Sequence, residues 1–200
     1  DEVFGSIKKK SFDEKSPYLP NSPYSASKAS ADLLVRSWNK TYKLPFNISY
    51  CTNNYGPYQD KEKFIPKIIL NSLNRKKIPL YGTGKNIRDW IYVEDNIEAV
   101  YLICTKGQRN KRYFISSQNE KTNIQLIREI FKEIKTNNYY NYSSLIKKVI
   151  DRKGHDLRYS LKTSKSLKKL NWKAKTNFKK GINETISWYI SNKKFFLKIK

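Results

Sequence analysis

The sequence contains little cysteine and histidine, no methionine and no long apolar run. Two cysteines, Cys51 and Cys104, and a single histidine among 200 residues are too few for a disulfide framework or a metal site. No apolar run approaches the ~20 residues that span a bilayer, and the N-terminal stretch DEVFGSIKKK lacks the charged-then-apolar order of a signal peptide. We therefore expect reduced cysteines, no metal, no membrane segment and a cytoplasmic protein.

Acidic residues are also scarce, with 17 Asp and Glu against 41 Lys and Arg, which gives a net charge of +24. Such an excess favours nucleic-acid binding, because basic side chains release counterions from phosphate. The lysines are nevertheless spread from Lys8 to Lys200, without an arginine-rich arm, a zinc pattern or a helix that is basic on one side only. We expect a solvated surface that attracts an anionic substrate, and no nucleic-acid partner.

The missing methionine, and a start that falls directly on a motif, suggest a fragment of a longer protein. A hydrophobic content of 38% suffices for one sizeable core, and no repeat or linker divides the chain. We expect one compact body.

Apolar periodicity and turn signals predict helices that alternate with short strands. The predicted helices cover 22–38, 65–73, 95–103, 123–134, 164–170 and 178–191. The predicted strands cover 46–52, 78–81, 112–115 and 147–150, with loops at 53–57 and over the Tyr/Asn-rich stretch after 134. Ser22 and Asp95 are the expected helix caps, and the last helix is expected to bury Ile182, Ile186, Trp188, Tyr189 and Ile190. This order indicates an α/β body with a parallel sheet and a smaller helix-containing lobe.

Tyr24 and Lys28 lie four residues apart at the start of the first predicted helix, so both project from one face. An ammonium close to a phenol stabilises the phenolate, which suits a tyrosine that abstracts a proton. The pair alone is weak evidence, because such pairs are common on helix surfaces.

Further motifs surround this pair. They are DEVFG at 1–5, SPYSASKA at 22–29, NNYGPY at 53–58, EKFIP at 62–66, IRDW at 87–90, YVED at 92–95 and DRKGHD at 151–156. Together they resemble the extended short-chain dehydrogenase/reductases, and more narrowly the dTDP-glucose 4,6-dehydratases within the NAD-dependent epimerase/dehydratase family. The resemblance covers almost the whole chain. Many members of the superfamily share Tyr-x-x-x-Lys, whereas far fewer combine the acidic pair with Asn-Asn-Tyr-Gly-Pro.

The resemblance implies the C-terminal part of a Rossmann-like parallel sheet flanked by helices, with a smaller helix-rich substrate-binding lobe. Residues 1–200 would form a single partial domain, with substrate-binding elements mainly in 53–95 and 111–200. Gly82-Thr83-Gly84 fails both as a dinucleotide turn and as a Walker loop. Related enzymes carry the glycine-rich NAD turn upstream of the Asp-Glu-Val segment, so we expect the fragment alone to bind NAD poorly and to be inactive.

The resemblance also implies a sugar-nucleotide 4,6-dehydratase that uses bound NAD and forms a 4-keto-6-deoxy sugar, such as the rhamnose precursor for surface polysaccharide. Tyr24, aided by Lys28, would take the proton of the sugar C4 hydroxyl while hydride leaves C4 for the nicotinamide. Glu2 would remove the C5 proton, and Asp1 would protonate the departing C6 hydroxyl.

The binding residues are carried over from the same resemblance. Tyr24, Lys28 and Asn54 would contact the cofactor. The nucleotide-diphosphate sugar would meet Asn53, Lys63, Phe64, Pro79, Tyr81, Arg88, Asn123, Arg152 and His155. Two departures are expected to alter the pocket: Lys153 stands where the family usually has Pro, and Ser116-Ser117 where it usually has Gly-Gly.

Several alternatives stay open. The substrate could be another nucleotide sugar, such as a UDP-linked acetamido sugar, and an epimerase or decarboxylase would share Tyr24 and Lys28 without needing Asp1 and Glu2. A basic nucleic-acid-binding protein and a non-catalytic remnant are the remaining hypotheses. The family also implies a homodimer formed through the helix from Tyr24 to Trp38.

Overall fold

The computed structural model describes residues 2–134 and 141–193. Its α-helices are α1 (Pro23–Tyr42), α2 (Phe64–Leu73), α3 (Val93–Lys106), α4 (Asn123–Ile134), α5 (Lys165–Lys169) and α6 (Phe178–Ser191), with a 3-10 helix η2 (Tyr142–Leu145). Its strands are β1 (Asn47–Cys51), β2 (Asn53–Tyr55), β3 (Ile78–Tyr81), β4 (Ile87–Tyr92), β5 (Lys111–Ile115), β6 (Glu120–Thr122), β7 (Ile146–Val149) and β8 (Arg158–Tyr159).

Helix α1 has sequence-encoded caps at both ends. The Ser22 side chain accepts a hydrogen bond from the Ser25 backbone N–H, and Pro23 occupies the first turn, where its missing N–H costs nothing. The helix ends at Tyr42, and the capping residue Lys43 has a left-handed φ of 58°. These signals fix the position of the Tyr-x-x-x-Lys pair in the first two turns.

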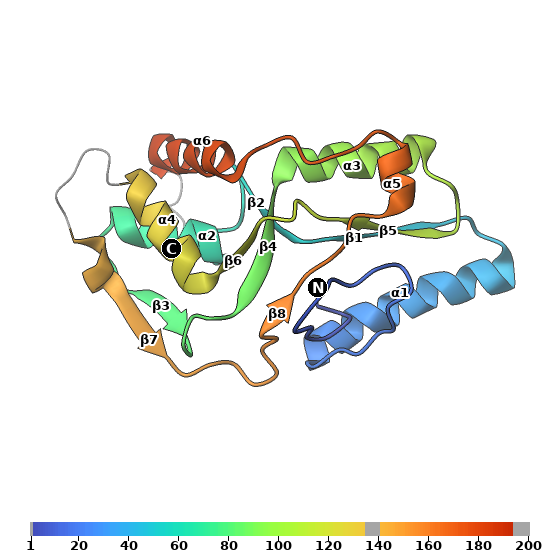
Figure 1. The fold of residues 1–200 in the computed structure, drawn as a ribbon, viewed down its shortest axis with the longest axis horizontal. Helices are drawn as coiled ribbons and strands as arrows, with labels where there is room; N and C mark the ends of the chain where they lie inside the picture. The colour runs from blue at the N-terminus through green and yellow to red at the C-terminus, as the bar shows by residue number, and fades with distance from the viewer. Residues whose placement is uncertain (1, 135–140, 194–200) are drawn as a thin grey trace.

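Strand β4 is the junction of the molecule, as Figure 1 shows at its centre. It pairs in parallel with β2 and β8, and antiparallel with β6. Strands β1 and β5 form a parallel pair toward one end, and β3 and β7 form another toward the opposite end. The segments that precede and follow β4 therefore meet around one strand.

The β1–β5 pair lies between α1 on one face and α3 on the other (Figure 1). Alternating residues of β5 serve the two faces. Phe114 packs with Phe4 and Ala29 on the α1 side, whereas Tyr113 and Ile115 pack with the α3 residues on the opposite side. This arrangement places the start of α1 against the sheet.

The second lobe is built by α2, α4, α6 and β3. Its buried side chains form one cluster, in which Ile68, Ile127, Ile182 and Tyr189 are almost inaccessible to solvent. The expected architecture, a parallel sheet flanked by helices with a smaller helix-rich lobe, is confirmed. Within the described residues, no helix is long and apolar enough to cross a membrane.

The structure confirms the predicted helices and strands apart from their ends and corrects three details. Asn53–Tyr55, expected within a loop, pairs with β4 as β2. Asp95 is not a helix cap, since α3 begins after Tyr92 and the Asp95 carboxylate instead accepts backbone N–H groups of Lys175 and Thr176. Ile190 is 51% exposed because it lies off the packed face of α6.

Strands β6 and β8 were not predicted, and part of the loop expected after residue 134 is the 3-10 helix η2. The rest of that loop, 135–140, lies outside the described residues.

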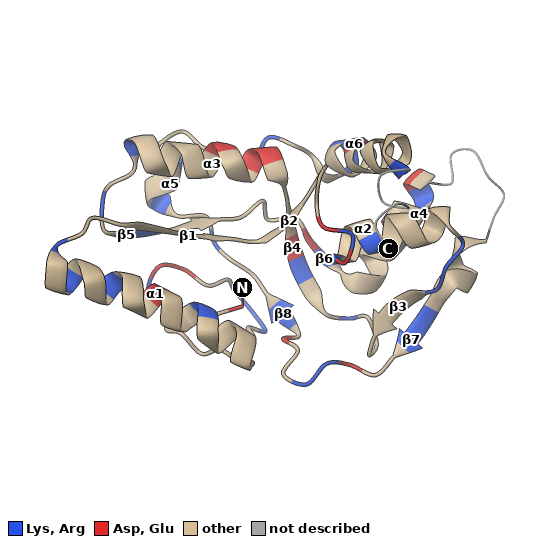
Figure 2. Ribbon diagram, turned by 180° about the vertical axis from the view of Figure 1, so that it is seen from behind, with Lys and Arg blue, Asp and Glu red and all other residues tan. Residues whose placement is uncertain are grey.

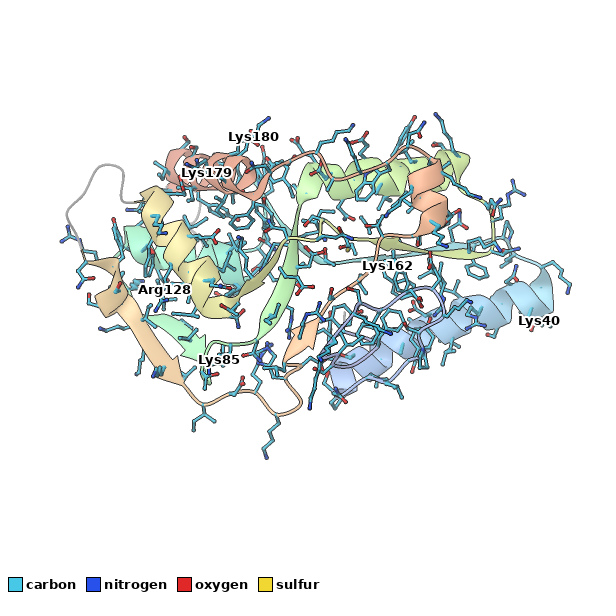
Figure 3. The ribbon with its side chains drawn as sticks, viewed as in Figure 1. Lys40, Lys85, Arg128, Lys162, Lys179 and Lys180 are labelled. Atoms are coloured by element: carbon cyan, nitrogen blue, oxygen red, sulfur yellow. The ribbon has the colours of Figure 1, made fainter. Side chains whose placement is uncertain are left out.

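Lys and Arg residues occur on most elements rather than along one stripe (Figure 2). Figure 3 labels six of them, which lie on several different elements. They are Lys40 on α1, Lys85 between β3 and β4, Arg128 on α4, Lys162 after β8, and Lys179 and Lys180 on α6.

Candidate active site

The Tyr24–Lys28 pair lies at the solvent-facing start of α1. The Lys28 ammonium is 5.5 Å from the centroid of the Tyr24 ring, so the charge lies close to the phenol as the spacing predicts. Tyr24 is 60% exposed to solvent. The two side chains therefore lie together on one face of the first two turns of α1.

Glu2 lies in the segment before α1, and Asp1 lies outside the described residues. The Val3 carbonyl accepts the Leu19 N–H at 3.0 Å, which ties this segment to the chain leading into α1. Gly5 permits the approach, since its φ is 80° and a Cβ would collide with the Leu19 carbonyl. The N-terminal segment is thereby held beside the start of the helix.

Glu2 forms an ion pair with Arg88, and 2.6 Å separates Glu2 Oε1 from Arg88 Nη2. Arg88 is buried in β4 and also donates to the backbone carbonyls of Ile87 and Asp156. Two residues expected to act on the same substrate, the carboxylate base and a phosphate ligand, are thus in direct contact.

Asp156 links this pair to the start of α1. Its Oδ1 accepts from Asn21 Nδ2 at 2.6 Å. Burial raises the pKa of Asp156, and the nearby Glu2 carboxylate acts in the same direction, although the Asn21 hydrogen bond and the Arg88 charge oppose them. The site therefore holds two carboxyl groups in different environments: Glu2 is paired with Arg88, and Asp156 is buried and accepts from Asn21.

The segment from Asp151 to His155 lies next to Asp156 and carries a network of polar contacts. His155 Nδ1 is 2.7 Å from Asp151 Oδ1, and His155 Nε2 is 2.8 Å from Arg152 Nη2. The Arg152 guanidinium lies 5.5 Å from the centroid of the Tyr81 ring. The hydrogen bond from His155 lowers the pKa of Asp151; burial opposes this, and the Arg152 backbone N–H and the Arg152 charge add smaller contributions in the lowering direction.

The turn that carries Lys153 and Gly154 closes against the start of α1. Gly154 has a φ of +69°, and a Cβ there would collide with the Asn21 carbonyl. Lys153 is exposed on this turn, and the turn keeps its approach to Asn21 without the usual Pro. Glu2, the start of α1, Arg88 and the 151–156 segment therefore form one cluster.

The remaining candidates lie on or next to β2, β3, α2 and α4. Asn123 begins α4 and donates its backbone N–H to the Asn86 carbonyl at 3.0 Å. Asn53 is an exposed residue of β2, and Pro79 lies in β3, next but one to Tyr81. Lys63 is exposed at the start of α2, and the Phe64 ring stacks near the Trp90 ring, with 6.4 Å between centroids.

Asn86, Asn21, Asp89 and Asp156 were not proposed as site residues. Asn86, just before β4, contacts the 151–156 segment, since its Nδ2 lies 3.2 Å from His155 Nδ1 and 3.3 Å from the Asp156 carbonyl. Asn86 and Asp89 flank Arg88, and Asp156 ends the Asp151–Asp156 motif. Their positions within or next to the motifs could have identified them from the sequence.

Ser116 and Ser117 direct their hydroxyl groups at Asp89. Both donate to its buried carboxylate, at 2.7 and 2.8 Å, and three backbone N–H groups of the same loop also point at it. The two hydroxyls thus anchor the loop to β4.

The described residues contain no group of three or more His, Cys, Asp or Glu arranged to hold a metal. Two buried oxygens after β1, Thr52 Oγ1 and Asn54 Oδ1, have no hydrogen-bond partner in the described part of the chain. Asn54 Nδ2 is already committed to Cys51 Sγ and the Thr52 carbonyl. Acceptors of this kind fit an amide donor such as a nicotinamide carboxamide.

A parallel sheet that carries a helix with Tyr-x-x-x-Lys at its start defines the chain as a short-chain dehydrogenase/reductase. A family model described as GDP-mannose 4,6 dehydratase matches residues 1–185, and the chain belongs to that family.

Named relatives agree with this assignment. A probable dTDP-glucose 4,6-dehydratase of Sinorhizobium fredii is 47% identical over 195 residues, which are 96% of this chain and 56% of the relative. The structure of DesIV, a dTDP-glucose 4,6-dehydratase from Streptomyces venezuelae with NAD and a second ligand bound, superposes with a TM-score of 0.91 at 40% identity. This match covers 97% of this chain and 59% of DesIV.

A dTDP-glucose 4,6-dehydratase from Bacillus anthracis in complex with NAD has a TM-score of 0.90 at 40% identity, and the match covers 100% of this chain and 62% of that protein. The chain therefore spans a little over half the length of the relatives it matches.

Proposed function

We propose that the chain is part of a cytoplasmic, NAD-dependent nucleotide-sugar 4,6-dehydratase that converts dTDP-glucose to dTDP-4-keto-6-deoxyglucose. The observation that carries this proposal is the contact between Glu2 and Arg88 beside the helix of Tyr24 and Lys28. An oxidation site needs only the tyrosine and lysine, whereas elimination of water also needs a carboxylate that can remove a proton. Glu2 supplies that carboxylate next to a guanidinium able to bind a diphosphate.

Tyr24 is the base for the first step and takes the proton of the C4 hydroxyl. Tyr24 acts as the phenolate, which the nearby Lys28 ammonium stabilises, and becomes the neutral phenol when it takes the proton. NAD, when bound, supplies the chemistry of accepting hydride from C4 and returning it to C6. Tyr24, Lys28 and Asn54 would hold it, since the phenol is exposed and Asn54 Oδ1 has no partner among the described residues.

Glu2 is the base for the second step: it removes the proton at C5, which the 4-ketone has made acidic, and it returns a proton to C5 when C6 is reduced. Asp1, the neighbouring carboxyl group, protonates the departing C6 hydroxyl. The guanidinium groups of Arg88 and Arg152 would donate hydrogen bonds to the diphosphate. Tyr81 and His155 contact Arg152. The uncharged contacts of Asn53, Phe64, Pro79 and Asn123, and the charge of Lys63, would complete the nucleotide-sugar site.

The proposal includes a homodimer formed through α1. This helix exposes an apolar face although its opposite face packs on the sheet. The exposed fractions are 51% for Leu33, 61% for Leu34, 54% for Trp38 and 63% for Tyr42. A second copy would cover this face as isologous interfaces do.

The test joins the chain to the upstream half of the Sinorhizobium fredii relative and follows ketosugar formation from dTDP-glucose with NAD. Tyr24→Phe and Glu2→Gln are each expected to lower kcat by about 10²-fold or more, because general acid–base groups contribute on that order. Tyr101→Phe and Glu94→Gln on α3 are matched controls on exposed residues. Full activity of both site variants would contradict the assigned roles.

A further inference from the structure

His155 is the only histidine of the chain, and its side chain is 5% exposed. Three polar side chains surround it. Asp151 Oδ1 and Asn86 Nδ2 approach Nδ1 at 2.7 and 3.2 Å, and Arg152 Nη2 approaches Nε2 at 2.8 Å. Both ring nitrogens are therefore committed within the protein.

These contacts fix the tautomer of the ring. A guanidinium has donors and no acceptor, so Nε2 must offer its lone pair to Arg152. A neutral imidazole carries one N–H, and that proton must then lie on Nδ1 and be donated to Asp151. Asn86 Nδ2 consequently donates to the Asp156 carbonyl, 3.3 Å away, rather than to the ring.

The Asp151 carboxylate is held in place by contacts on two sides. Its Oδ1 also accepts the backbone N–H of Arg152 at 2.8 Å. On its other side lies Gly82, where a Cβ would stand only 2.8 Å from Asp151 Oδ2. A residue with a side chain at Gly82 would displace the carboxylate, so the β3–β4 turn also depends on this contact.

We propose that Asp151 is a positioning residue of the substrate site. Asp151 fixes His155 in the Nδ1–H tautomer, and the free Nε2 lone pair of His155 holds the Arg152 guanidinium over the Tyr81 ring. The remaining N–H groups of Arg152 are then presented to the diphosphate of a nucleotide sugar. The inference rests on the proposed function, because a diphosphate is what the positioned guanidinium binds.

The single histidine makes the inference directly measurable. In a long-range ¹H–¹⁵N spectrum of the histidine-labelled 200-residue chain, His155 is expected as the Nδ1–H tautomer. Asp151→Asn introduces an amide that can donate to Nδ1, so the Nε2–H form should appear and Arg152 should lose its acceptor. The Kd for dTDP should then rise about tenfold, the order expected for losing one hydrogen bond to a charged group.

Asp151→Glu keeps an acceptor that cannot donate, and it should retain the Nδ1–H tautomer and recover most of the dTDP affinity. Asp13→Asn is the matched control, since Asp13 also accepts a nearby backbone N–H, that of Lys15, in a separate loop. This control should change neither measurement.

Two results would overturn the inference: an unchanged tautomer in Asp151→Asn, or a changed tautomer with unchanged dTDP affinity. Neither depends on turnover. The proposed function fails on a different result, the absence of ketosugar from the protein joined to its upstream half, so the two failures are distinguishable.

Discussion

Arg88 and Asp89 are neighbours on β4, and their side chains leave opposite faces of the strand. Arg88 contacts Glu2 and the Asp156 carbonyl, whereas Asp89 receives the loop of Ser116 and Ser117. Through Arg88 and Asp89, β4 therefore contacts the candidate base Glu2 on one face and holds the loop of Ser116 and Ser117 on the other. A buried guanidinium with three partners also contributes to stability, because its removal leaves those partners unsatisfied.

Arg88→Met should lower the free energy of unfolding by about 2 kcal/mol, since it removes hydrogen bonds made by a charged group. Urea unfolding of the chain would measure the change. Arg128→Met is the matched control, because Arg128 is exposed on α4 (Figure 3). Equal losses in both variants would show that the Arg88 contacts add nothing beyond a surface arginine.

Asp156 gives the site a pH dependence with a defined sign. Burial raises its pKa above the ordinary 3.8, so folding favours the protonated form. The stability contributed by the protonated group is present below 3.8 and is lost as the pH rises through the raised pKa. Asp156→Asn cannot ionise and keeps an acceptor for Asn21, so it should be more stable than the wild type at pH 7.

Thermal melting of both proteins between pH 3 and pH 8 would test this expectation. The difference should shrink as the pH falls and vanish once wild-type Asp156 is protonated. A constant difference across the range would assign the effect to packing rather than to charge.

At the scale of elements, the turn at Lys153 and Gly154 decides how the 151–156 segment meets α1. Gly154→Ala forces a side chain into a φ of +69° and against the Asn21 carbonyl. We expect a loss of about 1–3 kcal/mol in the free energy of unfolding, the usual range for strain of this kind. Lys153→Ala, in the same turn without a positive φ, should change stability by less than about 0.5 kcal/mol. Similar losses in the two variants would contradict this expectation.

The longer elements could be predicted because local signals agree with tertiary packing. Ser22 and Pro23 mark the start of α1, and the apolar spacing of α4 marks its buried face. Strands β6 and β8 have only three and two residues, and β2 has three, so they carry no periodicity of their own. They are strands because β4 pairs with them.

At the scale of the whole molecule, the motif residues that the sequence singled out include several that the fold brings together. Glu2, Arg88 and Arg152 are distant in sequence. Glu2 contacts Arg88 directly, Arg88 also contacts the Asp156 carbonyl, and Arg152 contacts the neighbouring His155. Asn21 and Asn86 could not be predicted, because an asparagine in a turn has no local mark that distinguishes a bridging amide. Their roles come from partners 135 and 70 residues away along the chain.

The apolar face of α1 leads to the last prediction, which concerns assembly. Leu34 and Trp38 lie four residues apart on the exposed face, and the proposed homodimer would bury both. Leu34→Lys combined with Trp38→Ala should raise the dimer dissociation constant at least about 100-fold, since buried aromatic and apolar anchors each contribute 2 kcal/mol or more.

Sedimentation equilibrium of the protein joined to its upstream half would measure the shift. The matched control is Ile97→Lys combined with Tyr101→Ala on α3, whose side chains are 59% and 65% exposed. Because α3 covers the opposite face of the sheet, the control should leave the dimer intact (Figure 1). A dimer that resists the α1 change and dissociates with the α3 change would place the interface on α3 instead.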